Sequence, residues 1–301
     1  MSTTDYLDAT LPHETNQPVV LDPEGDSGPG SIETVIRPSQ GWIAVNWSEI
    51  LHSRELFYTL ILRDIKIRYK QTVLGVAWAV IQPLFTMVVF TFIFGRLVGI
   101  DTDGVPYPLF AFAALVPWTF FSNAVSGAGL SLLTQQNLLT KIYFPRLFVP
   151  AATVGGFLVD LGIGLALFAF LLPVYGYWPG WGLLALPLLV VLTFVATLGI
   201  GLILAAATLL YRDLRFVIPF ALQILMYVSP VIYKANQLPR PLQYVAALNP
   251  MFGIITAYRS SILGMPWDLA SLAASTVSAF ALLAFGLSFF RKTERLIADI
   301  V

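Results

Sequence analysis

Side chains that commonly carry out catalysis or bind metals are scarce in this sequence. Cysteine is absent, and the only two histidines, His13 and His52, lie outside every apolar run. The sequence contains neither a Gly-x-x-x-x-Gly-Lys-Ser/Thr stretch nor a His-x-x-x-His pair, so we predict no nucleotide site, no metal site and no catalytic residue in this chain. A proton-driven pump or an intramembrane hydrolase would need such groups. The pattern therefore indicates a conduit whose energy is supplied elsewhere.

Asp160 is the one acid inside a long apolar stretch. A carboxylate at the centre of a membrane costs about 2.5–3.5 kcal/mol on insertion scales, so its presence needs a reason. It could contact a substrate or couple movements. It could instead be a helix-packing site, capped by a hydroxyl or an amide of a neighbouring helix. The packing interpretation is favoured because the apolar stretches contain no base that could serve as its partner.

Aromatic residues make up 14% of the chain, and several fall within apolar stretches next to amides. The C–H faces of sugar rings stack on aromatic rings, while amides and tyrosine hydroxyls bind sugar hydroxyls. Each residue taken alone is more often lipid-facing or part of the core. The candidates for lining a path are Trp78, Gln82, Phe85, Gln223, Tyr227 and Tyr233.

The composition places these side chains in a membrane. Of the 301 residues, 57% are hydrophobic and 11% charged, whereas a soluble domain carries about 25% charged residues. A spanning helix needs about 20 mostly apolar residues. We predict an all-α integral membrane protein with six transmembrane helices, at residues 73–95, 108–133, 147–172, 183–210, 216–233 and 269–290.

Three segments fall outside these spans. Residues 1–46 are acidic and proline-rich and predict a disordered cytoplasmic tail, followed by a membrane domain at 47–301. Residues 49–70 predict an amphipathic helix lying in the cytoplasmic interface. Asp64 and Arg68 lie on its apolar side and should pair with each other or with a buried partner. Residues 234–267 contain two short apolar stretches that predict external re-entrant helices.

Loop charges predict the orientation. Twelve lysines and arginines lie on the side that holds the ends of the chain, and four lie on the opposite side: Arg96, Lys234, Arg240 and Arg259. Cytoplasmic loops are enriched in such bases, so both termini are expected in the cytoplasm.

Five stretches, in order, resemble a known family. They are RDIKIRYKQTVLGVAWAVIQP at 63–83, NLLTKIYFPR at 137–146, YRDL at 211–214, SPVIY at 229–233 and NPM at 249–251. Together they resemble the permease subunit of type-2 ABC exporters for polysaccharides, the exporters of O-antigen, capsule and teichoic acid. The resemblance covers residues 49–299.

The resemblance implies a homodimer in a bacterial inner membrane, each permease docked on one of two cytoplasmic ATPase subunits that carry ATP and Mg, with no cofactor on this chain and no nucleic-acid partner. It implies a polyprenyl-diphosphate-linked polysaccharide as cargo, LPS O-antigen foremost. It implies ATPase docking through Asn137, Leu138, Lys141, Phe144, Pro145 and Arg146, with Arg212 and Asp213 as a second contact or a membrane anchor. Arg63, Lys66, Arg68 and Lys70 are placed to meet a diphosphate headgroup or anionic phospholipid.

Two alternatives stay open. An exporter of another lipid or of a drug would share the fold. A membrane-embedded glycan-modifying enzyme would need a catalytic acid or base, and only Asp160 is available.

Overall fold

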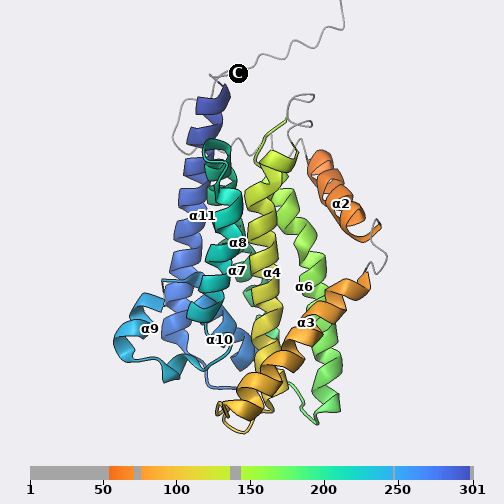
Figure 1. The fold of residues 1–301 in the computed structure, drawn as a ribbon, viewed down its shortest axis with the longest axis vertical. Helices are drawn as coiled ribbons and strands as arrows, with labels where there is room; N and C mark the ends of the chain where they lie inside the picture. The colour runs from red at the N-terminus through yellow and green to blue at the C-terminus, as the bar shows by residue number, and fades with distance from the viewer. Residues whose placement is uncertain (1–53, 71–75, 136–143, 247, 299–301) are drawn as a thin grey trace, which may run out of the picture. The chain divides into compact units, whose positions relative to one another are not determined.

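All the regular secondary structure is helical in the residues that the computed structural model describes, 54–70, 76–135, 144–246 and 248–298 (Figure 1). The longer helices are α2 (Arg54–Lys70), α3 (Val76–Phe90), α4 (Tyr107–Thr134), α6 (Phe148–Val174), α7 (Leu186–Leu210), α8 (Leu214–Val228), α10 (Pro250–Leu263) and α11 (Leu269–Ala298). The shorter ones are η1 (Thr91–Leu97), η2 (Trp181–Ala185), η3 (Ala235–Gln237) and α9 (Arg240–Ala246).

Within the described ranges, five helical segments are long and apolar enough to cross a membrane: 77–97, 107–134, 148–174, 181–210 and 269–294. They coincide with five of the six predicted spans to within a few residues. The first predicted span begins at 73, and its residues 73–75 lie outside the described part of the chain.

Helix α8, at the place of the remaining predicted span, has only 15 residues and ends at Val228 instead of Tyr233. At 1.5 Å per residue it is about 22 Å long, shorter than a hydrocarbon core of about 30 Å. Pro230 explains the early end, because the ring of a proline pushes the preceding residue out of the helical region. Ser229 accordingly has an extended backbone, with φ −78° and ψ 147°.

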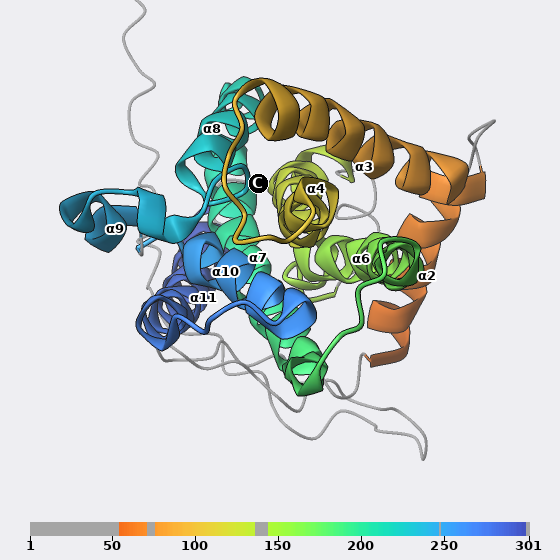
Figure 2. The same ribbon diagram turned by 90° about the horizontal axis from the view of Figure 1, so that it is seen from below.

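Helix α4 lies at the centre of the bundle and contacts α3, α6, α7, α8 and α10 (Figure 2). Its middle is uncharged and strongly aromatic, and Phe110, Phe112, Phe120 and Phe121 are fully buried there. The aromatic volume therefore goes into packing around a central helix. The Phe112 ring meets Phe168 of α6 edge-on, with ring centroids 5.5 Å apart.

Helices α7 and α11 touch through their backbones. A Cβ added at Gly199 of α7 would lie 2.6 Å from the backbone nitrogen of Leu283 in α11. Such a contact is below any normal van der Waals separation, so the absence of a side chain at Gly199 is what permits the close approach.

Helix α10 is short and almost entirely buried. The side chain of Asn249 accepts a hydrogen bond of 3.0 Å from the backbone N–H of Met251, Pro250 occupies the first turn, and Gly264 ends the helix with φ 68°. These are the usual start and stop signals of a helix. Fourteen residues cannot span a membrane, and α10 packs on α4, α7 and α11 instead.

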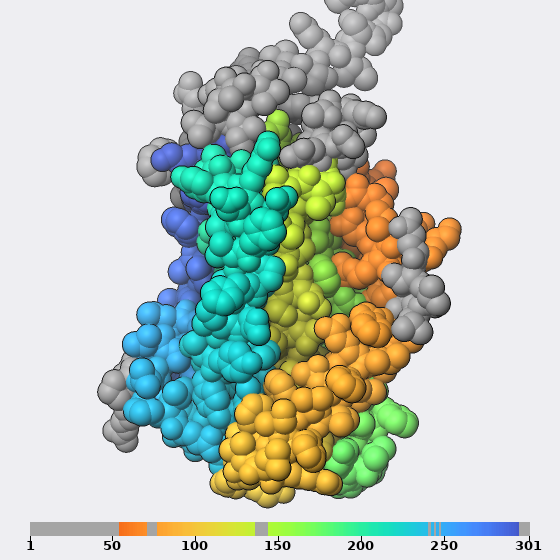
Figure 3. Space-filling model, viewed as in Figure 1, coloured from red at the N-terminus to blue at the C-terminus, as the bar shows by residue number. Residues whose placement is uncertain are grey.

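Helices α3 and α8 lie on the same side of α4 and form much of the front face in Figures 1 and 3. Both carry large exposed apolar side chains, among them Trp78 and Phe85 of α3 and Phe216, Phe220 and Tyr227 of α8. This α3–α8 face is therefore apolar and has no covering element among the described residues.

Candidate functional site

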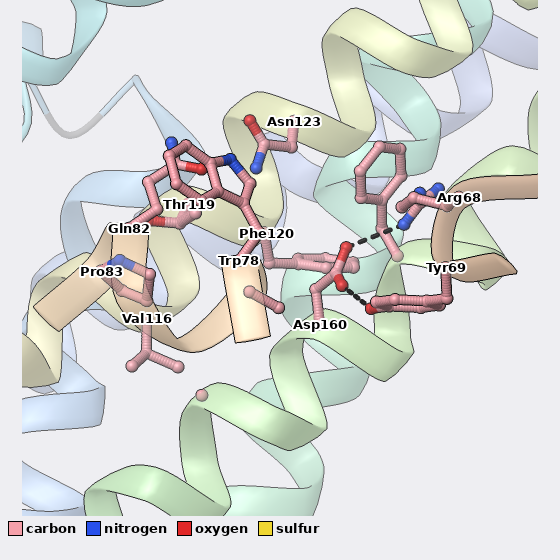
Figure 4. A pocket seen from close by; sticks show the side chains of 13 residues that line it. Arg68, Tyr69, Trp78, Gln82, Pro83, Val116, Thr119, Phe120, Asn123 and Asp160 are labelled. Carbon is pink, nitrogen blue, oxygen red and sulfur yellow. Dashed lines mark hydrogen bonds and ion pairs between the residues drawn. The ribbon is translucent and has the colours of Figure 1, made fainter. Parts of the chain in front are cut away.

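A cavity of about 520 Å³ lies where the end of α2 meets α3, α4 and α6 (Figure 4). Its walls combine apolar side chains with a few polar groups, which is typical of a site for an amphipathic ligand. The lining residues are Arg68 and Tyr69 of α2, Trp78, Ala79, Gln82 and Pro83 of α3, Val116, Thr119, Phe120 and Asn123 of α4, and Phe157, Asp160 and Gly164 of α6.

Asp160 is paired at one end of this cavity. Nη1 of Arg68 lies 2.8 Å from Oδ2 of Asp160, and the hydroxyl of Tyr69 donates to Oδ1. The Arg68 guanidinium also lies 3.4 Å from the ring centre of Phe157. Burial, reinforced by the hydrogen bond to Asp160, raises the pKa of Tyr69, so its hydroxyl stays protonated and donating. The acid of the apolar stretch is thus held by two donors from one helix end.

The expectation that Asp160 lacks a basic partner is wrong. It considered only bases inside the apolar spans, whereas Arg68 enters from the end of α2, 92 positions earlier in the chain. Arg68 was expected to pair with Asp64 or with a buried partner, and it pairs with Asp160, whose side chain is 20% exposed. Asp64 of α2 likewise has a partner in α6, because the hydroxyl of Thr153 donates a hydrogen bond of 3.1 Å to its carboxylate.

Helix α2 is bound to α6 along much of its length. Arg63 pairs with the neighbouring Asp64 at 2.8 Å and also donates to the side chain of Gln135 at 2.5 Å. Among the four bases predicted to meet a headgroup, Arg63 and Arg68 therefore have partners within the chain, while the side chains of Lys66 and Lys70 are exposed. The predicted helix over 49–70 is described from Arg54 onward; 49–53 lie outside the described residues.

The predicted path residues divide between two helices. Trp78, Gln82 and Phe85 share one exposed face of α3, and the first two also line the cavity. Gln223 and Tyr227 are exposed on α8, and their helical spacing places them on one face. Tyr233 lies beyond α8, and its hydroxyl donates to the carbonyl of Val228 at 2.7 Å.

Only part of the predicted docking segment is described. Asn137, Leu138 and Lys141 lie outside the described residues. Phe144 is buried in a cluster with Leu60, Phe148 and Val149, so its side chain anchors the segment on the bundle. Pro145 and Arg146 are partly exposed before α6, and Arg212 and Asp213 are exposed between α7 and α8.

The role of Arg259 was not predicted from the sequence, where it counts as an external loop base. Arg259 lies inside α10, is 3% exposed and donates to four backbone carbonyls, with its guanidinium 3.5 Å from the ring centre of Phe110. The acceptors are Phe110, Pro230, Val231 and Tyr233, at 2.7 to 3.2 Å. The one signal was an arginine within an otherwise apolar run. Its partners are 26 to 149 positions away.

Lys234 joins two connections near Arg259 of α10, with which it lines a cavity. Its ammonium group lies 2.9 Å from Asp101 and 2.8 Å from Asp103. Hydrogen bonds to the two carboxylates raise the pKa of Lys234, and its ammonium group lowers the pKa of Asp101. The connection before α4 is thereby held to the segment after α8.

Comparison with known proteins identifies the family. The ABC-2 type transporter family model matches residues 55–263, more than half of the chain and including the cavity residues and Arg259. The chain belongs to the ABC-2 type transporter family. It is similar to the O-antigen export system permease protein RfbA of Myxococcus xanthus, with 30% identity over 70% of this chain and 82% of the relative.

Two further relatives cover more of the chain. The O-antigen export system permease protein RfbA of Klebsiella pneumoniae is 25% identical over 82% of this chain and 95% of the relative. The polysialic acid transport protein KpsM of Escherichia coli is 22% identical over 78% of this chain and 92% of the relative.

Membership establishes the general role of the chain. It is a multi-pass membrane permease, and the membrane domain of this family has no nucleotide-binding site, so the chain is not itself an enzyme. Permeases of this family work with ATPase subunits. The predicted resemblance is confirmed at the level of the family.

Proposed function

We propose that this protein is the permease of an ATP-driven exporter that moves a polyprenyl-diphosphate-linked polysaccharide, most specifically LPS O-antigen, from the inner to the outer leaflet of a bacterial inner membrane. The observation that carries the proposal is the similarity to two O-antigen export permeases and one polysialic acid transport protein over most of their lengths. Both termini would face the cytoplasm, as the loop charges predict.

The uncovered α3–α8 face supports a path for a glycan. Exposed aromatic rings and amides alternate on it, with Trp78, Gln82 and Phe85 on one helix and Gln223 and Tyr227 on the other. Rings can stack on sugar C–H faces while amides exchange hydrogen bonds with sugar hydroxyls, without binding any one sugar tightly. Two copies of the chain facing each other across this surface would line a path between them, and this is the homodimer that we propose.

The diphosphate would meet the exposed bases of α2. Lys66 and Lys70 present their ammonium groups to solvent, whereas Arg63 and Arg68 hold the helix to its neighbours. Exposed ammonium groups at a membrane surface attract phosphate groups at about 1 kcal/mol each. We assign headgroup attraction to Lys66 and Lys70 and anchoring to Arg63 and Arg68.

The partner ATPase would dock on the segment before α6. Arg146 and Pro145 are partly exposed there, and Phe144 fixes the segment by packing against the bundle. Arg212 and Asp213 are the second proposed contact. Arg146→Glu should reduce co-purification of the ATPase, whereas Arg96→Glu, at an exposed base on the opposite side, should leave recovery unchanged.

Deletion of the gene tests the cargo. We expect polyprenyl-linked glycan to accumulate in the inner leaflet and surface polysaccharide to be lost, with restoration by the wild-type gene. Normal surface polysaccharide in the deletion strain would refute the proposal. Accumulation of a different lipid or greater drug sensitivity, with surface glycan intact, would favour the alternative of a lipid or drug exporter of the same family.

A further inference from the structure

A second cavity, of about 360 Å³, lies at the end of the bundle that carries α9 and α10, away from the cavity of Figure 4. We propose that it is a binding subsite for one pyranose ring of the exported glycan, with Trp267 as the stacking platform. The proposal rests on the proposed function for its ligand class and on the proposed orientation for its place at the exit. The volume lies within the roughly 300–1,000 Å³ of small-molecule sites.

Trp267 differs from the other tryptophans of the same end. Trp178 and Trp181, in the connection between α6 and α7, are 80% and 89% exposed, as expected of rings that anchor a helix end at the membrane surface. Trp267 is 41% exposed and lines the cavity. Half of its surface is therefore packed, and a ring held in this way can offer one face to a ligand.

Hydrogen-bonding groups line the same cavity as that ring. The amide of Asn236 has no partner among the described residues, and one carboxylate oxygen of Asp103 is left over after the other binds Lys234. The hydroxyls of Thr256 and Ser260 donate to backbone carbonyls, which leaves their oxygen lone pairs as acceptors. An amide, a carboxylate and hydroxyls in one cavity with an aromatic ring match the donors and acceptors of sugar hydroxyls.

The charges of the cavity argue against an anionic ligand. Lys234 is shared between two carboxylates, and Arg259 donates to four backbone carbonyls, so neither cation is free to bind a phosphate. A cationic headgroup fits poorly as well. Both oxygens of Asp268 accept from Ser271 at the start of α11, and Asp103 already faces Lys234. A neutral ligand rich in hydroxyls fits best.

Saturation-transfer NMR on the full chain in lipid nanodiscs would test the subsite. The probe is the mixture of oligosaccharides released by mild acid from the surface polysaccharide of the producing strain. We expect transfer to ring protons, about tenfold weaker binding in Trp267→Ala, a smaller loss in Asn236→Ala, and no change in the matched control Trp181→Ala. Unchanged thermal midpoints would show that the variants remain folded.

Two results would overturn the subsite. One is the absence of transfer, and the other is equal binding by wild type and Trp267→Ala, which would leave Trp267 as a membrane anchor. A competing arm uses dihexanoylphosphatidylethanolamine; its binding in place of the oligosaccharides would identify a lipid headgroup site instead.

The deletion strain separates this inference from the proposed function. If surface polysaccharide depends on the gene but Trp267→Ala binds oligosaccharide like wild type, only the subsite fails. If Trp267-dependent binding is observed but deletion leaves surface polysaccharide intact, the site binds sugar and the proposed cargo is wrong.

Discussion

Replacing Arg259 by methionine should destabilise the fold more than removing the charge of Asp160, Lys234 or Arg96. Methionine keeps much of the length and apolar volume of the stem but donates no hydrogen bond. The carbonyls of Phe110, Pro230, Val231 and Tyr233 would lose their donor inside the bundle. The carbonyls of Pro230, Val231 and Tyr233 follow the end of α8, where the helix dipole is negative and favours a cation, whereas that of Phe110 belongs to the first turn of α4.

The magnitude follows from the four acceptors. At about 1 kcal/mol for each hydrogen bond lost, the loss is about 4 kcal/mol. Hydrogen bonds within a membrane measure about 0.6 kcal/mol each, which lowers the figure to about 2.5 kcal/mol. Removing the guanidinium also removes the cost of burying its charge, and this gain works in the opposite direction. We expect a net loss of about 2–4 kcal/mol, because the four carbonyls stay where they are.

Thermal unfolding of the purified protein in nanodiscs would measure the effect. A loss of about 3 kcal/mol corresponds to a midpoint lower by about 6–12 °C for a chain of this size. The midpoint of Arg259→Lys should lie between those of wild type and Arg259→Met, since one ammonium group cannot reach four carbonyls. Arg96→Met is the control, because Arg96 is exposed and should change stability by no more than about 0.5 kcal/mol. A midpoint for Arg259→Met equal to that of Arg96→Met would refute the reasoning.

Three further perturbations test other contacts by the same midpoint. Asp160→Ala should lower the free energy of unfolding by about 1–2 kcal/mol, a modest loss because the ion pair with Arg68 is partly exposed. The exchanged pair, Arg68→Asp with Asp160→Arg, should recover part of this loss. A double exchange no more stable than Asp160→Ala would contradict direct pairing. The second perturbation is Lys234→Met. The difference in free energy of unfolding between wild type and this variant should be constant from about pH 5 to pH 9. This difference should be lost as the pH falls through the pKa of Asp101, which is lowered from its usual value of about 3.9. It should also be lost as the pH rises through the pKa of Lys234, which is raised above about 10.4. A change of the difference near neutral pH would count against the contact. Gly199→Val should prevent the close packing of α7 on α11 and lower the thermal midpoint. The control Gly162→Val should be tolerated, because no atom lies within 4 Å of a Cβ added at Gly162. Equal midpoints for the two variants would exclude the close packing.

The long spans were predictable because the signal for them is local. Twenty uncharged residues in a row identify a membrane helix whatever surrounds it, and the five long helices follow the predicted ranges closely. The end of α8 was equally local but was overlooked. The apolar run continues to Tyr233, while Pro230 ends the helix at Val228. The backbone restriction imposed by Pro230 therefore determines where the helix ends, and the length of the apolar run does not.

The contacts of the two cavities were beyond the reach of the sequence. The ion pair of Arg68 with Asp160 depends on α2 lying against α6, and nothing within either segment specifies that placement. Arg259 satisfies its charge with backbone carbonyls, which every residue has, so no pattern of side chains marks its partners. The polar residues could be identified as exceptional, but their partners could not.

These contacts also bear on the proposed orientation. The positive-inside rule counts bases, yet a base neutralised within the fold is not available to the cytoplasmic surface in the same way. Of the four bases assigned to the outer side, Lys234 is bound by two carboxylates and Arg259 is enclosed by carbonyls. Of the twelve assigned to the inner side, Arg63 and Arg68 pair with acids. The proposed orientation therefore continues to rest on the number of bases in the sequence, twelve against four, and not on which of them the fold pairs.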